Sequence, residues 1–192
     1  MIIACLGDSI TAGSPLWDPD PAVRAHIGEP DERSQWQWWA VQTMPQLDFR
    51  NFGVNGERTD QIASRFANAV QGVDALVVQG GINDIVQRRP VDDAARNLAG
   101  MAERAQQFGL RVAIANVLPW NNGDARAAQD IAHLNDLARA IADRLGVPLF
   151  PFHDTLADPA QPHRMRDEWT DDGNHPSVEG HRLLGERAFL VP

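Results

Sequence analysis

The sequence alternates short apolar runs with longer segments in which apolar residues recur at helical spacing, and this alternation constrains the fold more than any other feature. The apolar runs are predicted as five strands, near residues 2–6, 47–52, 75–79, 111–118 and 147–152. Helices are predicted near residues 35–44, 59–70, 92–108, 125–145 and 177–189, with Ser34 and Ser177 as the N-caps of the first and the last, and residues 153–174 are predicted to be irregular. The tryptophans at positions 36, 38 and 39 are interpreted as core residues. Strands that alternate with helices are typical of a parallel sheet covered by helices on both faces. We therefore expect an α/β fold with a central five-stranded parallel sheet.

The chain length and composition indicate one ordinary globular domain. With 192 residues the chain is long enough to bury a core without a metal or a disulfide, so we expect a single domain over residues 1–192. The formal net charge of -9 disfavours nucleic acid as a partner, because phosphates would be repelled. No apolar run reaches membrane-spanning length, and no secretory signal precedes the first strand, so a cytoplasmic location is expected. The single cysteine, Cys5, is interpreted as a buried core residue.

A serine follows the first predicted strand directly. Gly7, Asp8 and Ser9 end the apolar run, and this position puts the Ser9 hydroxyl at the carboxyl edge of the sheet. Open α/β folds bind their ligands at that edge. Ser9 is therefore a candidate nucleophile, although the same three residue types also form ordinary turns.

The partners that a nucleophilic serine needs stand near the end of the chain. Asp172 precedes His175 by three residues, and Gly173 between them lets the chain turn. A carboxylate can then orient one imidazole nitrogen and leave the other free to accept the serine proton. Asp171 is an alternative orienting acid, but the spacing favours Asp172.

An acyl-transfer site also needs hydrogen-bond donors where negative charge develops on the substrate oxygen. Candidate donors follow three of the predicted strands: the backbone N–H of Ser9, the backbone N–H of Gly56 and the side-chain amide of Asn83. Gly53 lies in the same loop as Gly56 and is an alternative.

These residues occur in four ordered blocks, which begin at Gly7, Gly56, Gly81 and Asp172 and read Gly-Asp-Ser-Ile, Gly-Glu-Arg-Thr, Gly-Ile-Asn-Asp and Asp-Gly-Asn-His. The set resembles the SGNH subgroup of the GDSL-type esterases and lipases over residues 3 to 185. The resemblance implies a flavodoxin-like three-layer α/β/α sandwich and an esterase with no metal or organic cofactor. It also implies that Ser9, Asp172 and His175 form the catalytic triad, and that Ser9, Gly56 and Asn83 form the oxyanion hole.

The implied substrate is a small-molecule ester cleaved through an acyl-enzyme intermediate, with short-chain acyl or acetyl esters favoured. A lysophospholipase or an acyl-thioesterase is the alternative within this chemistry. Trp17, Trp120 and Trp169 lie on loops around the expected site and either line the substrate pocket or pack those loops down. The proline-rich loop of residues 15–33 leaves from beside Ser9 and is expected to overhang the site.

Several polar residues also fit other roles. The acids Asp8, Asp84 and Asp154 stand near strand ends and could bind a divalent cation instead. A non-enzymatic small-ligand binder or a phospho-acceptor module built on Asp8 would need neither Asn83 nor His175. Surface or hydrogen-bonded roles are expected for the remaining histidines, which are His26, His133, His153, His163 and His181. The sequence carries no prediction of the oligomeric state.

Overall fold

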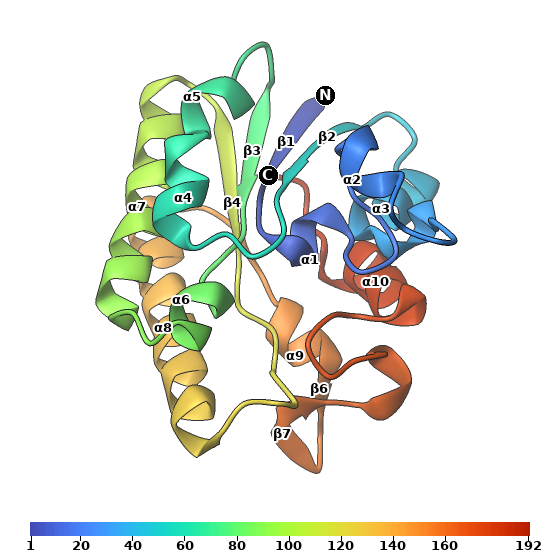
Figure 1. Cartoon of the computed structure of the whole chain (residues 1–192). Coiled ribbons are helices and arrows are strands. Elements are labelled where there is room, and N and C mark those ends of the chain that lie inside the picture. Colours follow the sequence, from blue (N-terminus) through green and yellow to red (C-terminus); the bar gives the residue numbers. More distant parts are fainter.

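The computed structural model describes residues 1–192 and has one central sheet with helices on both faces (Figure 1). Its strands are β1 (Ile2–Gly7), β2 (Asp48–Gly53), β3 (Ala75–Val78), β4 (Arg111–Ala115) and β5 (Leu149–Phe150). They lie in the order β2-β1-β3-β4-β5, and every neighbouring pair is parallel. This is the flavodoxin-like order. The predicted α/β sandwich with a five-stranded parallel sheet is confirmed.

The helices follow the strands along the chain. The helices of six or more residues are α3 (Trp36–Thr43), α4 (Thr59–Ser64), α7 (Val91–Gln107), α8 (Ala125–Leu145) and α10 (Val178–Leu183). The helices of four or five residues are α1 (Ser9–Ala12), α2 (Pro21–Arg24), α5 (Phe66–Ala69), α6 (Ile82–Val86) and α9 (Phe152–Leu156). A hairpin of β6 (Ala157–Asp158) and β7 (Gln161–Met165) stands apart from the main sheet. None of these helices has both the length and the apolar character that a membrane crossing requires.

Two apolar cores lie on opposite faces of the sheet, and β1 contributes to both. Ala4 and Leu6 pack in a core with residues of α4, α5, α7 and α8, whereas Ile3 and Cys5 pack in a second core with residues of α3, α9 and α10. Alternate strand residues point to opposite faces, so a strand buried on both faces is apolar throughout. This explains the unbroken apolar run at the start of the sequence.

An aromatic cluster forms the centre of the second core. The Trp36 ring is fully buried and contacts Phe49, Phe150, Phe152 and Phe189 at centroid distances of 5.7, 6.4, 5.7 and 5.8 Å. Core packing was the predicted role of the tryptophans around α3. Trp36 fits it fully, while Trp38 and Trp39 are half-buried and pack on each other.

Several local predictions were wrong. Residues 153–174 were expected to be irregular, yet they contain most of α9 and the β6–β7 hairpin, and α6 was not expected at all. These elements have five residues or fewer each, too few for a periodic pattern to show. Ser34 was expected to cap α3, but its hydroxyl donates to the carbonyl of Gly13 at 2.8 Å. Ser177 does cap α10, and its Oγ accepts from the N–H of Gly180 at 3.2 Å.

Candidate active site

Ser9 is the first residue of α1, directly beyond the carboxyl end of β1 (Figure 1). Asp8 caps this helix, because its Oδ1 accepts the N–H of Ile10 at 3.0 Å. Gly7 permits the tight turn, since a Cβ there would lie 2.2 Å from the Thr11 hydroxyl oxygen. β1 lies between β2 and β3 in the sheet. The strand order reverses at β1, and open α/β sheets bind their ligands at such a point.

The structure brings Ser9, His175 and Asp172 into one chain of polar contacts. The Nε2 atom of His175 lies 3.1 Å from the Oγ of Ser9, and its Nδ1 lies 2.7 Å from Oδ2 of Asp172. The other carboxylate oxygen of Asp172 accepts the backbone N–H groups of Asn174 at 2.8 Å and His175 at 2.7 Å. The acid beside the ring is therefore Asp172, and Asp171 makes no such contact.

Electrostatics keep Asp172 ionised. Burial alone would raise the pKa of this carboxyl, but hydrogen bonds from the His175 ring and from the backbone N–H groups of His175 and Asn174 outweigh burial and hold the pKa below its usual range. An ionised carboxylate on Nδ1 favours the imidazole tautomer that carries its proton there. Nε2 is then free to accept a proton from the serine hydroxyl.

The loop that follows β4 holds the Asp172–His175 segment in place. The side-chain amide of Asn122 donates to the carbonyl of Asp172 at 2.8 Å and to Oδ1 of Asn174 at 2.9 Å, and the backbone N–H of Asn121 donates to the carbonyl of Gly173 at 2.9 Å. No role was predicted for these asparagines from the sequence. Only the polar Asn-Asn pair next to Gly123 indicated one.

Asn83 and Gly56 come from the loops that follow β3 and β2. The side-chain amide of Asn83 donates one hydrogen to the carbonyl of Glu57 at 2.9 Å, and its second amide hydrogen remains available. The backbone N–H of Gly56 makes no hydrogen bond within the chain. By contrast, the N–H of Gly53 donates to Oδ1 of Asn51 at 2.9 Å, and a Cβ on Gly53 would lie 2.1 Å from the backbone of α1. Of the two glycines, Gly56 has the free donor.

A pocket of about 210 Å³ opens over Ser9. Its lining residues are Ser9, Ile10, Asn55, Ile82, Asn83, Val86, Trp120, Asn174 and His175. A larger hollow of about 420 Å³ lies between β7 and the turn after it, but charged and polar residues make up nearly all of its lining. The smaller pocket holds the nucleophile, the base and an apolar wall together, so its chemistry and not its size identifies it as the candidate site.

Of the three loop tryptophans, only Trp120 lines this pocket. Trp17 instead packs under Arg24, with 4.4 Å between the guanidinium carbon and the ring centroid, and Trp169 packs under Arg166 at 4.8 Å. Neither ring lines the pocket, and each stacks against an arginine of its own segment.

The loop of residues 15–33 does not overhang the pocket, and that expectation was wrong. None of its residues lines the cavity. Gly13, in a left-handed conformation with φ of 102°, ends α1 and turns the chain toward α3, and the short helix at Glu32–Ser34 contacts α10. The direction of this turn depends on contacts between distant segments, which the local composition does not encode.

The acids near the strand ends, which were the alternative cation ligands, contact other groups of the protein or are buried. Asp84 accepts both the N–H of Thr59 at 2.9 Å and its hydroxyl at 2.8 Å, and Asp154 lies 3.3 Å from the His153 ring. Asp8 is fully buried, and burial raises its pKa to about 6. No group of three or more His, Cys, Asp or Glu side chains is arranged to hold a metal ion.

His181 differs from its expected role. Its side chain is fully buried on α10, and neither ring nitrogen has a hydrogen-bond partner within the chain. Burial, with a smaller contribution from the nearby His175, lowers the pKa of His181 to about 3. A surface or hydrogen-bonded role was expected, and the structure shows neither.

The model of the GDSL-like Lipase/Acylhydrolase family matches residues 5–183. The chain belongs to this family. Membership in this family supports the conclusion that the protein is a hydrolase that acts on small-molecule esters. Among curated proteins none matches the chain.

Solved structures of GDSL-family proteins share the fold. A lipolytic protein of the G-D-S-L family from Desulfitobacterium hafniense superposes with a TM-score of 0.79 at 21% identity, covering 96% of this chain and 95% of that one. A G-D-S-L family protein from Veillonella parvula gives 0.77 at 22% identity, with coverage of 96% and 94%. The lipase/acylhydrolase from Enterococcus faecalis gives 0.74 at 21% identity, with coverage of 96% and 91%.

Proposed function

We propose that the protein is a serine esterase that works through an acyl-enzyme intermediate. The observation that carries this proposal is the continuous contact from Ser9 Oγ through the His175 ring to the Asp172 carboxylate, at 3.1 and 2.7 Å. His175 takes the hydroxyl proton as Ser9 attacks the ester carbonyl carbon, and then gives that proton to the departing alcohol. A water molecule, deprotonated by the same ring, attacks the acyl-enzyme, and Ser9 leaves with the proton to release the acid.

The oxyanion of the tetrahedral intermediate would be bound by the N–H groups of Ser9 and Gly56 and by the free amide hydrogen of Asn83. Two features support this assignment: the Gly56 N–H has no partner within the chain, and Asn83 lines the pocket beside Ser9. Donors held in place before the reaction stabilise charge that appears only in the transition state. Removal of one such donor in an acyl-transfer site typically lowers kcat by about 10²–10³.

The preferred substrate is proposed to be a short-chain acyl or acetyl ester. The pocket volume of about 210 Å³ lies below the range of roughly 300–1,000 Å³ that is usual for drug-sized ligands. Ile82, Val86 and Trp120 form its apolar wall, which suits a small acyl group, and Asn55 and Asn174 offer amides to the rest of the substrate.

The proposal is tested with p-nitrophenyl esters from acetate to palmitate, using the wild type, Ser9→Ala and the matched control Ser64→Ala on the exposed side of α4. Ser9→Ala is expected to lower kcat by at least about 10³-fold and to abolish labelling by a fluorophosphonate. Ser64→Ala should leave both unchanged, and the rates should decline from acetate or butyrate toward palmitate. Full activity in Ser9→Ala would refute the serine mechanism, while a maximum at long chains would favour the lysophospholipase alternative.

A further inference from the structure

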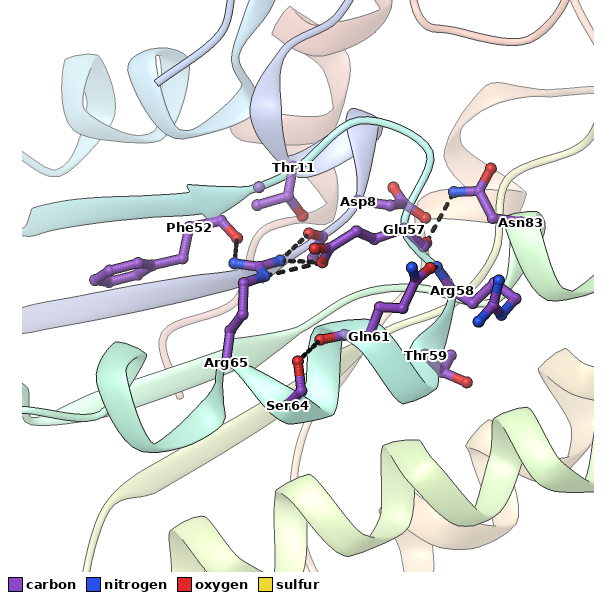
Figure 2. Close-up of polar contacts among 12 residues, drawn as sticks. Asp8, Thr11, Phe52, Glu57, Arg58, Thr59, Gln61, Ser64, Arg65 and Asn83 are labelled. Carbon is purple, nitrogen blue, oxygen red and sulfur yellow. Dashed lines mark hydrogen bonds and ion pairs between the residues drawn. The ribbon is translucent and has the colours of Figure 1, made fainter. Parts of the chain in front are cut away.

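One arginine outside the pocket joins the segments that carry the proposed oxyanion donors. Arg65 lies between α4 and α5, and its guanidinium points toward the ends of β1 and β2 (Figure 2). Its Nη1 donates to the carbonyl of Phe52 at 2.8 Å, and its Nη2 donates to the carbonyl of Gly7 at 3.1 Å. Its Nε and Nη2 also bind Oε2 of Glu57 at 2.9 and 2.6 Å.

The three acceptors occupy informative positions in the chain. Gly7 is the last residue of β1, two residues before Ser9. Phe52 lies at the end of β2, where the loop to α4 begins, and Glu57 directly follows Gly56 in that loop. The Arg65 side chain therefore holds two parts of the chain between β2 and α4, at Phe52 and at Glu57, against the end of β1, which leads to Ser9.

Glu57 extends this connection to the third donor. While its carboxylate binds Arg65, its backbone carbonyl accepts the amide of Asn83 at 2.9 Å (Figure 2). That hydrogen bond sets the orientation of the Asn83 amide and hence the direction of its second hydrogen. Displacement of Glu57 would move the Gly56 N–H and release the Asn83 side chain together.

We propose that Arg65, acting through Glu57, is a positioning residue for the oxyanion hole. The inference rests on the proposed serine esterase function. An arginine suits the task because its planar fork presents five donors in a fixed geometry, whereas a lysine ammonium is a compact point charge with three donors. The pair is also more buried than a typical surface ion pair, since the side chains of Arg65 and Glu57 are only 25% and 18% exposed.

The test compares Arg65→Met, Arg65→Lys and Glu57→Gln with the wild type. The matched control is Arg144→Met, which removes an exposed ion pair to Glu103 between α8 and α7, away from the pocket. Concentrations of active enzyme are obtained by titration with a fluorophosphonate, and kcat and KM are measured with p-nitrophenyl acetate. Thermal unfolding is followed for each variant.

Arg65→Met is expected to lower kcat by about 10- to 100-fold with KM changed by less than about threefold. The loss is smaller than for deletion of a donor, because a misplaced donor still stabilises the oxyanion in part. Arg65→Lys and Glu57→Gln should show smaller losses in the same direction. Arg144→Met should keep kcat within about twofold of the wild type, as expected for a surface pair far from the chemistry.

A second substrate separates positioning from a merely structural effect. In p-nitrophenyl thionoacetate the carbonyl oxygen is replaced by sulfur, a much weaker hydrogen-bond acceptor, so that well-placed donors favour the oxygen ester. The ratio of kcat/KM for the oxygen ester to that for the thionoester should fall in Arg65→Met and Glu57→Gln. A variant that only loses folded protein would lower both rates equally and leave the ratio unchanged.

The outcomes distinguish the two proposals. A wild type that neither hydrolyses an ester nor reacts with the fluorophosphonate would overturn the proposed function itself. An active wild type, together with Arg65 variants that keep both kcat and the oxygen-to-sulfur ratio, would overturn the positioning role and leave the serine mechanism standing. If Arg65→Met does not fold, Arg65→Lys and Glu57→Gln decide by the same two measurements.

Discussion

Replacement of His181 by leucine should make the protein more resistant to acid. The His181 ring is fully buried and both of its nitrogens lack partners, so the folded state accepts a proton there only when the pH approaches 3. A histidine in the unfolded chain titrates near 6.5. Leucine has a similar volume and no polar atoms, so the substitution removes the buried ring without opening a large cavity.

The size of the effect follows from proton linkage. Between pH 6.5 and 3 only the unfolded state binds the His181 proton, so the free energy of unfolding falls as the pH is lowered through that window. The slope approaches about 1.4 kcal/mol per pH unit, which gives on the order of 3 kcal/mol between pH 6.5 and 4. For a chain of this length that corresponds to roughly 6–12 °C in Tm.

Asp8 contributes with the opposite sign. Because burial raises its pKa from 3.8 to about 6, the folded state takes up this proton before the unfolded state does. That contribution to the free energy of unfolding increases as the pH falls from 6 toward 3.8. It is present in both the wild type and the variant, so it cancels when their Tm values are subtracted.

The assay is thermal unfolding followed by circular dichroism at pH 7, 6, 5 and 4 for the wild type, His181→Leu and the control His133→Leu, whose native side chain is 57% exposed. At pH 7 the Tm of His181→Leu should equal or exceed that of the wild type, because a buried polar group without a partner costs about 1–3 kcal/mol. The difference should widen toward pH 4, and the control should follow the wild type. Parallel curves for wild type and His181→Leu would refute the reasoning.

Three further predictions concern the site and the core. Asp172→Asn would place an amide N–H against His175 Nδ1 and favour the wrong tautomer, so kcat for p-nitrophenyl acetate should fall by about 10⁴ with little change in KM; a loss below tenfold would contradict it. Asn122→Ala removes both side-chain hydrogen bonds to the Asp172–Asn174 segment and should lower kcat by roughly 10- to 100-fold at similar Tm, and an unchanged kcat would show that this segment holds itself in place. Trp36→Ala empties the centre of the aromatic cluster and should lower the free energy of unfolding in urea by about 3–5 kcal/mol, and a cost under about 1 kcal/mol would contradict that central role.

The sheet and the long helices could be predicted because their signals are local. The start and the end of α8 were predicted at Ala125 and Leu145, and the structure has the same bounds. The Asp172–His175 contact could also be predicted from the sequence. The two residues are three positions apart, and Gly173 between them lets the chain turn so that the carboxylate reaches the ring. Ser9 was singled out by its place at the end of a buried strand, which the parallel topology puts at the ligand-binding edge.

The tertiary structure alone decided how these segments meet. Ser9 and His175 are 166 residues apart, and only the packing of α10 against α3, with the loop before α10 lying beside Ser9, brings Nε2 to 3.1 Å from Oγ. The same holds for the different hydrogen bonding of the Gly53 and Gly56 N–H groups, for the positions of Trp17 and Trp169 away from the pocket, and for the contact of Arg65 with Gly7 across 58 residues. The physical reason is that periodicity and spacing report which face of a strand or helix is buried, whereas partners between distant segments depend on how those faces pack together.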